Sequence, residues 1–550
     1  MMKRPAPRLA SDSNGVVAPI VALSLFALIA VGGLAFDYAH MAALHTELQN
    51  AADQAALAAA TQLDGQGNAQ ARATAAAQSL VRNLSLFASD NSSNTTDPRK
   101  VEVATLTFYQ SYDRVNDVYG ALSTTDANSK FVKVTITPRQ ANFSLTPIVG
   151  AFSSGLLPAE ALASLGTAIC KTPPVMICNP SETGSNKDFD ANALKGHGLK
   201  LVSVGGGNGS WAPGNFGYLN NNGGSNGVPG LQEGLGWSSP PGDCTPSDAV
   251  NTKPGGNVPA TDALNTRFDI YGSNSSCQNG GLCPASINSV KDVVRPANAS
   301  GNNACKLQNS GWQLSSNYYG KNLMLMSVSP LPTTTTPTSM GHPRDICHAV
   351  AGSVTGNCSG NPIGDGVWDR DAYFRTNYRR TSGPSVGTYW THADWQANTS
   401  LTETSNPPRP TRYEVYSWEI AKRGMTIDGV TVLGPNPASA SGNTLVSYGN
   451  PVCSQIQTPS YGTGIVPDAN TPDRRRTAMA VVNCQQNSVN GSSTNVPVLK
   501  FVDLFLTEPS LARDNTGQGD IYVEIIGETP AGGAQTAGQV IRHDKPYLIR

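Results

Sequence analysis

Charged residues are scarce in this sequence. Only 14% of the 550 residues are Asp, Glu, Lys or Arg, and the formal net charge is −1. A chain that binds nucleic acid presents a basic surface to the phosphates, so this composition argues against nucleic acid as a main partner. The apolar share of 39% also argues against a disordered chain, which lacks enough apolar surface to form a core.

Cysteine is missing from the first 169 residues, and no two cysteines stand in the C-x-x-C spacing of zinc sites. The ten that follow are an even number, which favours disulfides in an oxidising compartment over free thiols in the cytosol. The sequence cannot fix the connectivity. Close spacing favours four pairs: Cys170–Cys178, Cys277–Cys283, Cys347–Cys358 and Cys453–Cys484.

Charge is absent from Val16–Phe36, an apolar run long enough to cross a bilayer as a helix. Three basic residues precede it within residues 1–15, and no Lys or Arg follows until Arg72. This asymmetry predicts a cytoplasmic N-terminal tail, a transmembrane helix over 16–36 and an external remainder. A cleaved secretory signal is the alternative, but its apolar region is usually only about 7–15 residues long.

Gly and Pro are absent from Asp37–Leu63, and Ala-rich sequence continues to Ala88, which predicts an extracytoplasmic helical segment over 37–88. Apolar residues recur there at steps of three and four, as in a narrow coiled-coil seam. They form a predicted interaction stripe of Met41, Leu44, Leu48, Ala51, Ala55 and Ala58. Two interpretations stay open: the stripe packs on the protein's own domain, or it packs on other subunits.

A family resemblance rests on this N-terminal pattern. Gly15, the uninterrupted apolar helix, Asp37 at its outer end and LQNAADQAALAAA over Leu48–Ala60 together resemble the TadE/TadG-like proteins of Tad (Flp) pilus assembly. Residues 167–180 are more loosely similar to a segment of these proteins, and residues 209–219 and 263–271 resemble the Tad-type C-terminal region. The resemblance implies a single-pass protein of the bacterial inner membrane with a periplasmic domain. Its expected partners are other pilus-assembly or pilin-like proteins.

One position departs from the pilins of this superfamily, which keep a Glu five residues after the cleavage glycine. Counted from Gly15, that position holds Ile20. A buried carboxylate registers neighbouring pilins, since an unpaired charge in lipid is costly. Its absence favours a non-catalytic, membrane-anchored assembly accessory. The alternatives are an exported minor pilin or adhesin, and a membrane-tethered extracytoplasmic enzyme.

The remaining sequence predicts an α+β fold. Residues 98–182 read as a small pilin-like module, with strands at Val101–Tyr109 and Phe131–Thr137 and a short helix at Ala159–Ala168. Residues 183–550 are rich in Gly and Asn, which favours a β-rich, loop-rich, disulfide-linked domain without regular helices. The strands expected there are Leu199–Val204, Tyr413–Glu419, Gly429–Leu433, Ala478–Asn483, Val498–Leu506 and Ile521–Ile526.

No motif gives a specific signal for catalysis, for a cofactor or for a metal site. GPSVG at Gly383–Gly387 matches the G-x-S-x-G elbow of hydrolases, but it lacks the strand before and the helix after that would expose Ser385. Acidic groups at 188–192 and 365–371 leave a calcium site open, although solvated loops are the simpler interpretation. The aromatic-rich segment Tyr373–Trp395 is either a recognition surface or ordinary core.

Overall fold

The protein was analysed as a computed structural model. It describes residues 17–549 apart from 65–66, 81–83, 91–96, 98, 114–116, 147–152, 171–173, 203–214, 221–226, 242–243, 247–248, 273–276, 278–280, 320–329, 348–362, 454–463, 469–470, 514–518 and 530–540.

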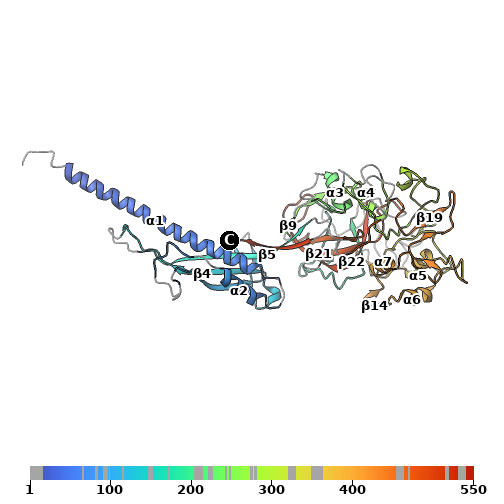
Figure 1. The fold of residues 1–550 in the computed structure, drawn as a ribbon, viewed down its shortest axis with the longest axis horizontal. Helices are drawn as coiled ribbons and strands as arrows, with labels where there is room; N and C mark the ends of the chain where they lie inside the picture. The colour runs from blue at the N-terminus through green and yellow to red at the C-terminus, as the bar shows by residue number, and fades with distance from the viewer. Residues whose placement is uncertain are drawn as a thin grey trace, which may run out of the picture. The chain divides into compact units, whose positions relative to one another are not determined.

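The chain forms two compact units (Figure 1). Unit 1 consists of Met1–Gly166 together with the C-terminal segment Asp544–Arg550, and unit 2 consists of Thr167–His543. The composition changes near residue 183, whereas the units divide at Gly166. The C-terminal segment also returns to the first unit, which no feature of the sequence indicates.

Two helices form one layer of unit 1. Helix α1 spans Val17–Ala60 without interruption, so its 44 residues extend for about 66 Å. Helix α2 spans Ala69–Leu80. The predicted transmembrane segment and the first part of the predicted helical segment 37–88 therefore form one helix. The rest of that segment is not continuous with it, because α1 ends at Ala60, α2 is a separate helix and residues 84–88 are not helical. Figure 1 shows the first part of α1 projecting beyond the sheet of the same unit.

A mixed-length sheet forms the second layer, in the order β1–β4–β5–β23. Its strands are Val103–Tyr109, Phe131–Arg139, Leu157–Cys170 and Ile541–Leu548. Burial alternates along β4, as expected for a strand with one covered face. Val132, Val134 and Ile136 contact the Ala-rich surface of the helices. Smaller elements are β2 (Tyr112–Asp113), β3 (Val118–Tyr119) and η2 (Asp126–Asn128).

The helix predicted at Ala159–Ala168 is wrong, because this segment is strand β5. Ala161 lies opposite Val134 and Ala163 lies opposite Val132 in an antiparallel ladder with β4. Alanine favours helices intrinsically, but tertiary context overrides so weak a preference. Here the small side chains line the sheet face that contacts α1 and α2.

A six-stranded sheet organises unit 2, in the order β6–β20–β21–β22–β7, with β10 paired to β21. Its strands are Met176–Cys178, Arg476–Val482, Val496–Leu506, Ile521–Glu528, Gly198–Val202 and Ala249–Val250. The pairs β20–β21, β21–β22 and β22–β7 are antiparallel, and β6 joins β20 in parallel. The strands expected near 199, 478, 498 and 521 are thus present.

Further short strands lie outside this six-stranded sheet, and one of them, β9, pairs with β5. They are β8 (Asn215–Leu219), β9 (Cys244–Pro246), β11 (Thr252–Pro254), β12 (Val293–Pro296), β13 (Gln313–Leu314), β14 (Thr404–Ser405), β15 (Pro408–Arg409), β16 (Thr426–Ile427), β17 (Val430–Thr431), β18 (Pro435–Asn436) and β19 (Leu445–Tyr448). Strand β17 falls within the strand predicted at Gly429–Leu433.

Helices also occur in unit 2, contrary to the prediction. They are α3 (Gly227–Gly236), α4 (Ala260–Asn265), η4 (Thr266–Phe268), η6 (Asn302–Cys305), α5 (Arg370–Asn377), α6 (His392–Thr399) and α7 (Arg412–Ala421). The strand expected at Tyr413–Glu419 is therefore helix α7. Its aromatic and β-branched residues suggest a strand, but Thr411 and Glu414 form a capping box that starts a helix.

Three disulfides link described cysteines: Cys178–Cys484, Cys277–Cys283 and Cys305–Cys453. The Cys277–Cys283 pair is one of the four that close spacing favours, and it is confirmed. The expected pairs Cys170–Cys178 and Cys453–Cys484 are wrong, because the parallel pairing of β6 with β20 brings Cys178 next to Cys484. Cys347 is disulfide-bonded, and Cys358 lies outside the described residues. Cys170 lies opposite Cys244 in the β5–β9 ladder.

Candidate functional site

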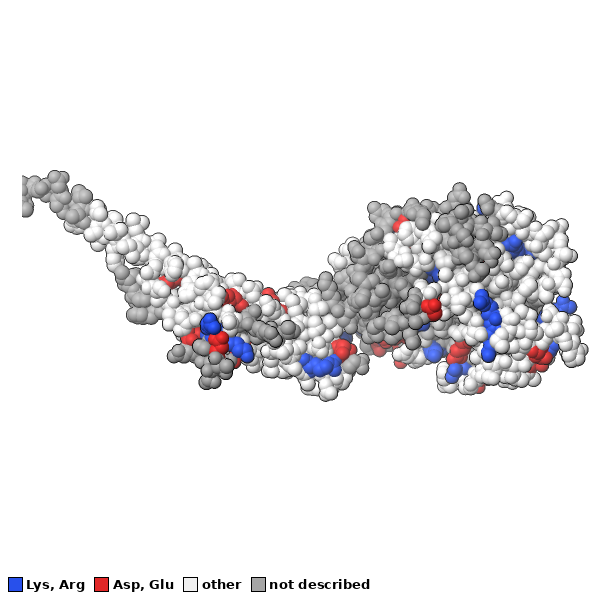
Figure 2. Space-filling model, viewed as in Figure 1, with Lys and Arg blue, Asp and Glu red and all other residues white. Residues whose placement is uncertain are grey.

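The first half of α1 is apolar and exposed. Within Pro19–Ala60, only 6% of the most apolar 18-residue window is buried, so this is not the core helix of a soluble domain. Figure 2 shows the described part of this stretch as an uncharged surface on the face in view. More than half of the surface of each large apolar side chain is exposed: Ile20, Val21, Leu23, Leu25, Phe26, Leu28, Ile29, Val31, Leu34 and Phe36.

The second half of α1 is buried in unit 1. Five members of the predicted interaction stripe are buried, namely Leu44, Leu48, Ala51, Ala55 and Ala58, and Met41 is half-buried. The buried residues contact the sheet and α2, where Ala73 and Ala77 allow a close approach. This arrangement matches the interpretation in which the stripe packs on the protein's own domain. Little of the surface of the stripe is therefore exposed for contact with another subunit.

Asp37 marks the point where the exposed half of α1 meets the rest of unit 1. Its side chain is 1% exposed. The carboxylate accepts hydrogen bonds from the backbone N–H groups of Ser144, Leu145 and Thr146, at 2.9, 2.9 and 2.6 Å. The Thr146 hydroxyl donates a fourth, at 2.6 Å. One acidic side chain thus holds the turn at residues 144–146 against the helix.

Gly33 lies one helical turn before Asp37 on the same side of α1. A Cβ atom at this position would lie 2.8 Å from the Cβ of Leu145, closer than real side chains approach. The absence of a side chain therefore lets the turn reach the helix, and Asp37 then bonds its amides. The pair Gly33 and Asp37 forms one docking position for the turn.

The pKa of Asp37 follows from this geometry. Burial alone would raise it, because a charged carboxylate loses hydration. The hydrogen bonds from the Thr146 hydroxyl and the three backbone amides outweigh that effect and hold the pKa well below its usual range. Asp37 is therefore ionised at neutral pH, and its four donors offset the charge.

A second turn docks farther along α1. Glu47 accepts hydrogen bonds from the Ser85 hydroxyl at 2.8 Å and from the Leu86 N–H at 3.1 Å. The ring of Phe87 packs edge-on against His40, with 5.2 Å between the ring centroids. Asn142 joins this turn to the first one, because its N–H donates to the Ser89 hydroxyl at 2.6 Å. Two acidic residues of α1 thus hold two neighbouring turns.

Several charged residues of unit 2 are buried inside the fold. Arg412, at the start of α7, is fully buried and donates to Glu524 on β22 at 2.7 Å and to Asp345 at 2.5 Å. Glu524 also accepts from the backbone N–H groups of Arg412 and Tyr413, so a carboxylate lies at the helix N-terminus, where the dipole favours it.

Asp345 extends this charged centre to the neighbouring loops. Its carboxylate accepts from the N–H groups of Gly198, at 2.8 Å, and Gly366, at 2.6 Å. A Cβ atom at Gly364 would lie 2.1 Å from the carboxylate, so this position requires glycine. We call Arg412, Asp345 and Glu524 the buried triad. It joins α7, β22, β7 and the 364–366 loop.

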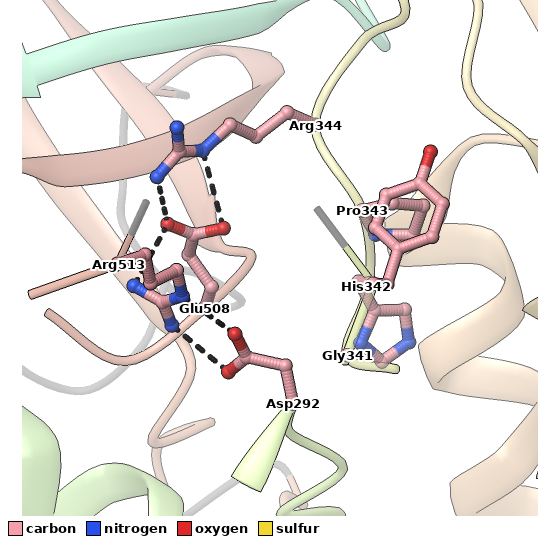
Figure 3. A pocket seen from close by; sticks show the side chains of 8 residues that line it. Asp292, Gly341, His342, Pro343, Arg344, Glu508 and Arg513 are labelled. Atoms are coloured by element: carbon pink, nitrogen blue, oxygen red, sulfur yellow. Dashed lines mark hydrogen bonds and ion pairs between the residues drawn. The ribbon is translucent and has the colours of Figure 1, made fainter. Parts of the chain in front are cut away.

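A narrow pocket lies beside a second set of ion pairs (Figure 3). Arg513 pairs with Asp292 at 2.5 Å and with Glu508 at 3.4 Å, and Glu508 also pairs with Arg344. Figure 3 shows these four side chains joined one to the next, with His342 to the side of Asp292. The enclosed space is about 20 Å³, enough for about one water molecule. The charges neutralise one another, so this pocket has neither the room nor the net charge of a substrate site.

His342 is buried between aromatic rings and polar partners. Its ring stacks on Tyr373 with centroids 5.0 Å apart. Arg475 donates to Nδ1 at 3.2 Å, which places the ring proton on Nε2, 3.5 Å from the Glu419 carboxylate. Burial, with the nearby charge of Arg475, lowers the pKa of His342 to about 4. The ring is therefore neutral at pH 7.

The motifs left open by the sequence have local structural roles. Residues 383–387 form a turn and not a strand–helix elbow, so Ser385 is not a nucleophile of that type. The carboxylate of Asp190 accepts from the N–H groups of Asn192 and Ala193, and that of Asp369 caps α5 through the Ala372 N–H. No group of three or more His, Cys, Asp or Glu able to hold a metal occurs within the described ranges.

The aromatic-rich segment Tyr373–Trp395 is mainly core. Tyr373, Phe374, Tyr378, Trp390 and Trp395 are buried in one cluster with Trp368. Phe374 and Trp395 stack with centroids 5.1 Å apart. Arg380 bonds Asp428 at 2.5 Å beside this cluster. Core packing therefore accounts for these residues.

The comparisons with known proteins single out α1. Residues 15–62 match a family described as putative Flp pilus-assembly TadE/G-like. The chain carries a TadE/G-like segment. The match covers less than a tenth of the 550 residues and coincides with α1, including Gly33, Asp37 and Glu47. No curated protein and no solved structure gives a significant match to the chain.

Neither docking turn lies in the TadE/G-like segment, and sequence reasoning missed both. Asp37 stood out only as an acidic residue at the end of an apolar run. Its partners are 107 to 109 positions away, in a stretch without a motif. The buried triad was missed for the same reason, because 67 and 112 positions separate Arg412 from Asp345 and Glu524.

Replacing Asp37 by Asn will release the turn at residues 144–146. An amide offers one acceptor oxygen, and its NH₂ group faces N–H donors. Hydrogen exchange on the full-length chain in detergent should show faster exchange at Ser144, Leu145 and Thr146, with the β4 amides unchanged. The control is Asp97→Asn, since Asp97 bonds Arg99 in a local turn. Equal protection of the three amides in Asp37→Asn and in the unaltered chain would contradict the role given to Asp37.

Replacing Arg412 by Met will destabilise unit 2 by about 3–5 kcal/mol, because two buried carboxylates lose their partner. The control is Arg409→Met in the same region, where the Arg409–Glu414 pair is partly exposed and should contribute less than about 1 kcal/mol. All seven tryptophans lie in unit 2, so urea unfolding followed by intrinsic fluorescence reports on that unit. Similar losses in the two variants would contradict the importance of the triad.

The stability of unit 2 will fall as the pH drops from about 6.5 to about 4. In this window the unfolded chain protonates His342, whereas the folded state keeps it neutral. The total loss is about 3 kcal/mol, and it stops below the folded pKa. Glutamine at this position accepts from Arg475 and donates to Glu419 without titrating. His342→Gln should therefore remove this part of the pH dependence in urea titrations, and an unchanged pH profile would contradict the assignment.

Proposed function

We propose that this protein is a membrane-anchored accessory of Tad (Flp) pilus assembly that acts through protein association and not through catalysis. The observation that carries the proposal is the TadE/G-like match over residues 15–62, on a helix whose first half is apolar and exposed. The family description supports a role in assembly. An exposed apolar run of this length fits the hydrocarbon core of a bilayer.

The placement of charge supports an orientation with the N-terminus in the cytoplasm. Lys3, Arg4 and Arg8 precede the apolar run, and the next basic residue is Arg72. The positive-inside bias then puts units 1 and 2 in the periplasm, where disulfides form. The three disulfides described in unit 2 are in keeping with that compartment.

The charged groups of unit 2 support a structural role. Two buried carboxylates, those of Asp345 and Glu524, accept hydrogen bonds from an arginine and from backbone amides. The pocket in Figure 3 holds paired charges and little space. Such groups stabilise loops, whereas catalytic acids and bases need access to a substrate.

Ile20 favours an anchored accessory over a fibre subunit. It occupies the position where pilins of the superfamily keep a glutamate, and it is exposed on α1. A minor pilin would be processed after Gly15 and leave the membrane with the fibre. An accessory would remain anchored.

Fractionation with intact-mass measurement tests this function. We expect the mature chain at full length in the inner membrane, resistant to carbonate extraction, with a periplasmic marker protein as the control for release. A product that begins at Val16 and appears in sheared fibres would overturn the accessory role in favour of a minor pilin. A soluble periplasmic product lacking α1 would overturn the anchor.

A further inference from the structure

We infer that the turn at residues 143–146 and the turn at residues 84–87 sit in the outer interface of the lipid bilayer, so that unit 1 rests on the membrane. This inference rests on the proposed function, because it needs α1 to be a transmembrane anchor. The occupant of this surface is the boundary between lipid headgroups and acyl chains. We call these two turns the seating turns.

The depth of the first seating turn follows from Gly33. Leu145 contacts α1 at that position, which lies inside the apolar run of residues 16–36. Gly33 precedes the end of the run by three residues, or about 4.5 Å along the helix. If the run fills the hydrocarbon layer, Leu145 lies at its outer edge.

The exposed side chains at this level are apolar or aromatic. Leu145 is 47% exposed although it touches the helix. Its neighbours along α1 are Leu34, Phe36 and Tyr38, all more than half exposed. Aromatic residues concentrate where headgroups meet acyl chains, because their rings are apolar and their edges are polar. The apolar surface of the anchor therefore continues onto unit 1.

The hydrogen bonds of the turn suit a site with little water. Three consecutive N–H groups and the Thr146 hydroxyl bond to the Asp37 carboxylate. In water, exposed amides need no such partner. In lipid, each unpaired group costs several kcal/mol, so irregular backbone is found only where its polar groups are satisfied by protein. Asp37 satisfies them at the level where the helix leaves the apolar layer.

The second seating turn repeats the pattern. Leu86 is 75% exposed, and Leu84 and Phe87 are also exposed, while the Leu86 N–H bonds to Glu47. Asn142 bonds Ser89, so the two turns are held side by side. The carboxylates point inward to the amides, and the large apolar side chains remain on the outside.

Depth measurement by nitroxide labelling tests this inference on the full-length chain in phosphatidylcholine vesicles. Single cysteines are introduced as Leu145→Cys and Leu86→Cys, with Phe36→Cys as the lipid reference. Leu122→Cys is the control, because Leu122 is similarly exposed in unit 1, 61%, but belongs to a different loop. No free cysteine occurs in the described part of the chain, so the label adds to the new residue. The unaltered chain treated with the same label gives the background.

We expect the labels at 145 and 86 to collide with oxygen more, and with a water-soluble nickel complex less, than the label at 122. The ratio should be severalfold higher and closer to that at 36. If 36 is lipid-like while 145 and 86 match 122, the anchor stands and the seating inference is overturned. If 36 is also water-like, the transmembrane anchor itself fails, and the proposed function fails with it. Exchange protection at Ser144 in each variant checks that labelling left the turn folded.

Discussion

The docking of one turn on Asp37 is the interaction on which the arrangement of unit 1 depends. A turn can pack against the side of an apolar helix only if its backbone N–H groups find hydrogen-bond acceptors. The carboxylate supplies four hydrogen bonds at one point, and Gly33 supplies the space one turn earlier. Both features lie within a single helix. The exposed and buried halves of α1 can therefore meet without a break in its hydrogen-bond ladder.

The alanines of α1 and α2 follow from the same constraint. The buried half of this straight helix fits closely against the rest of unit 1. Ala51, Ala55 and Ala59 on α1 are fully buried, and so are Ala73 and Ala77 on α2. Small side chains bring the helices near each other and near the sheet, while β4 supplies the larger Val and Ile residues. A stripe of small residues thus reports on packing inside unit 1.

Unit 2 is stabilised differently, because much of it lacks long regular elements. Its loops are tied to the central sheet by disulfides and by buried ion pairs. A buried ion pair is not a strong source of stability compared with an apolar core, since both charges lose hydration. It does fix geometry, because a carboxylate left without its arginine is expensive. The buried triad therefore specifies where α7 and the loops around Gly198 and Gly366 lie.

Local patterns in the sequence were enough for some of these features. The apolar run, the Ala-rich continuation and strands such as β4, β20 and β22 follow from composition and alternation. The sequence predicts a helix where β5 lies, because alanines such as Ala161 and Ala163 favour helices locally. Only the pairing with β4 makes this segment a strand. The sequence predicts a strand where α7 lies, because residues such as Tyr413 and Val415 favour strands. The capping box of Thr411 and Glu414 starts a helix there instead.

Contacts between distant residues were beyond sequence reasoning. Cys178 and Cys484 are 306 positions apart, and only the strand order brings them together. The same holds for Asp37 with its turn and for Arg412 with its two carboxylates. Each contact joins residues that only the complete fold brings together, and no repeating pattern in the sequence predicts it. The residue types were informative, because a single acidic residue after an apolar run needs hydrogen-bond donors. The sequence did not show which residues supply those donors.

Burial of the stripe narrows how this protein can associate with others. Leu44, Leu48 and Ala51 are committed to the core of unit 1, so a partner cannot use them without unfolding that core. The other helical surface, residues 19–36, is apolar and has no charged group with which to register a neighbour. Contacts there would be weak in specificity, because lipid tails compete equally well for apolar side chains. Polar surfaces outside α1 are therefore better suited to specific association than either half of this helix.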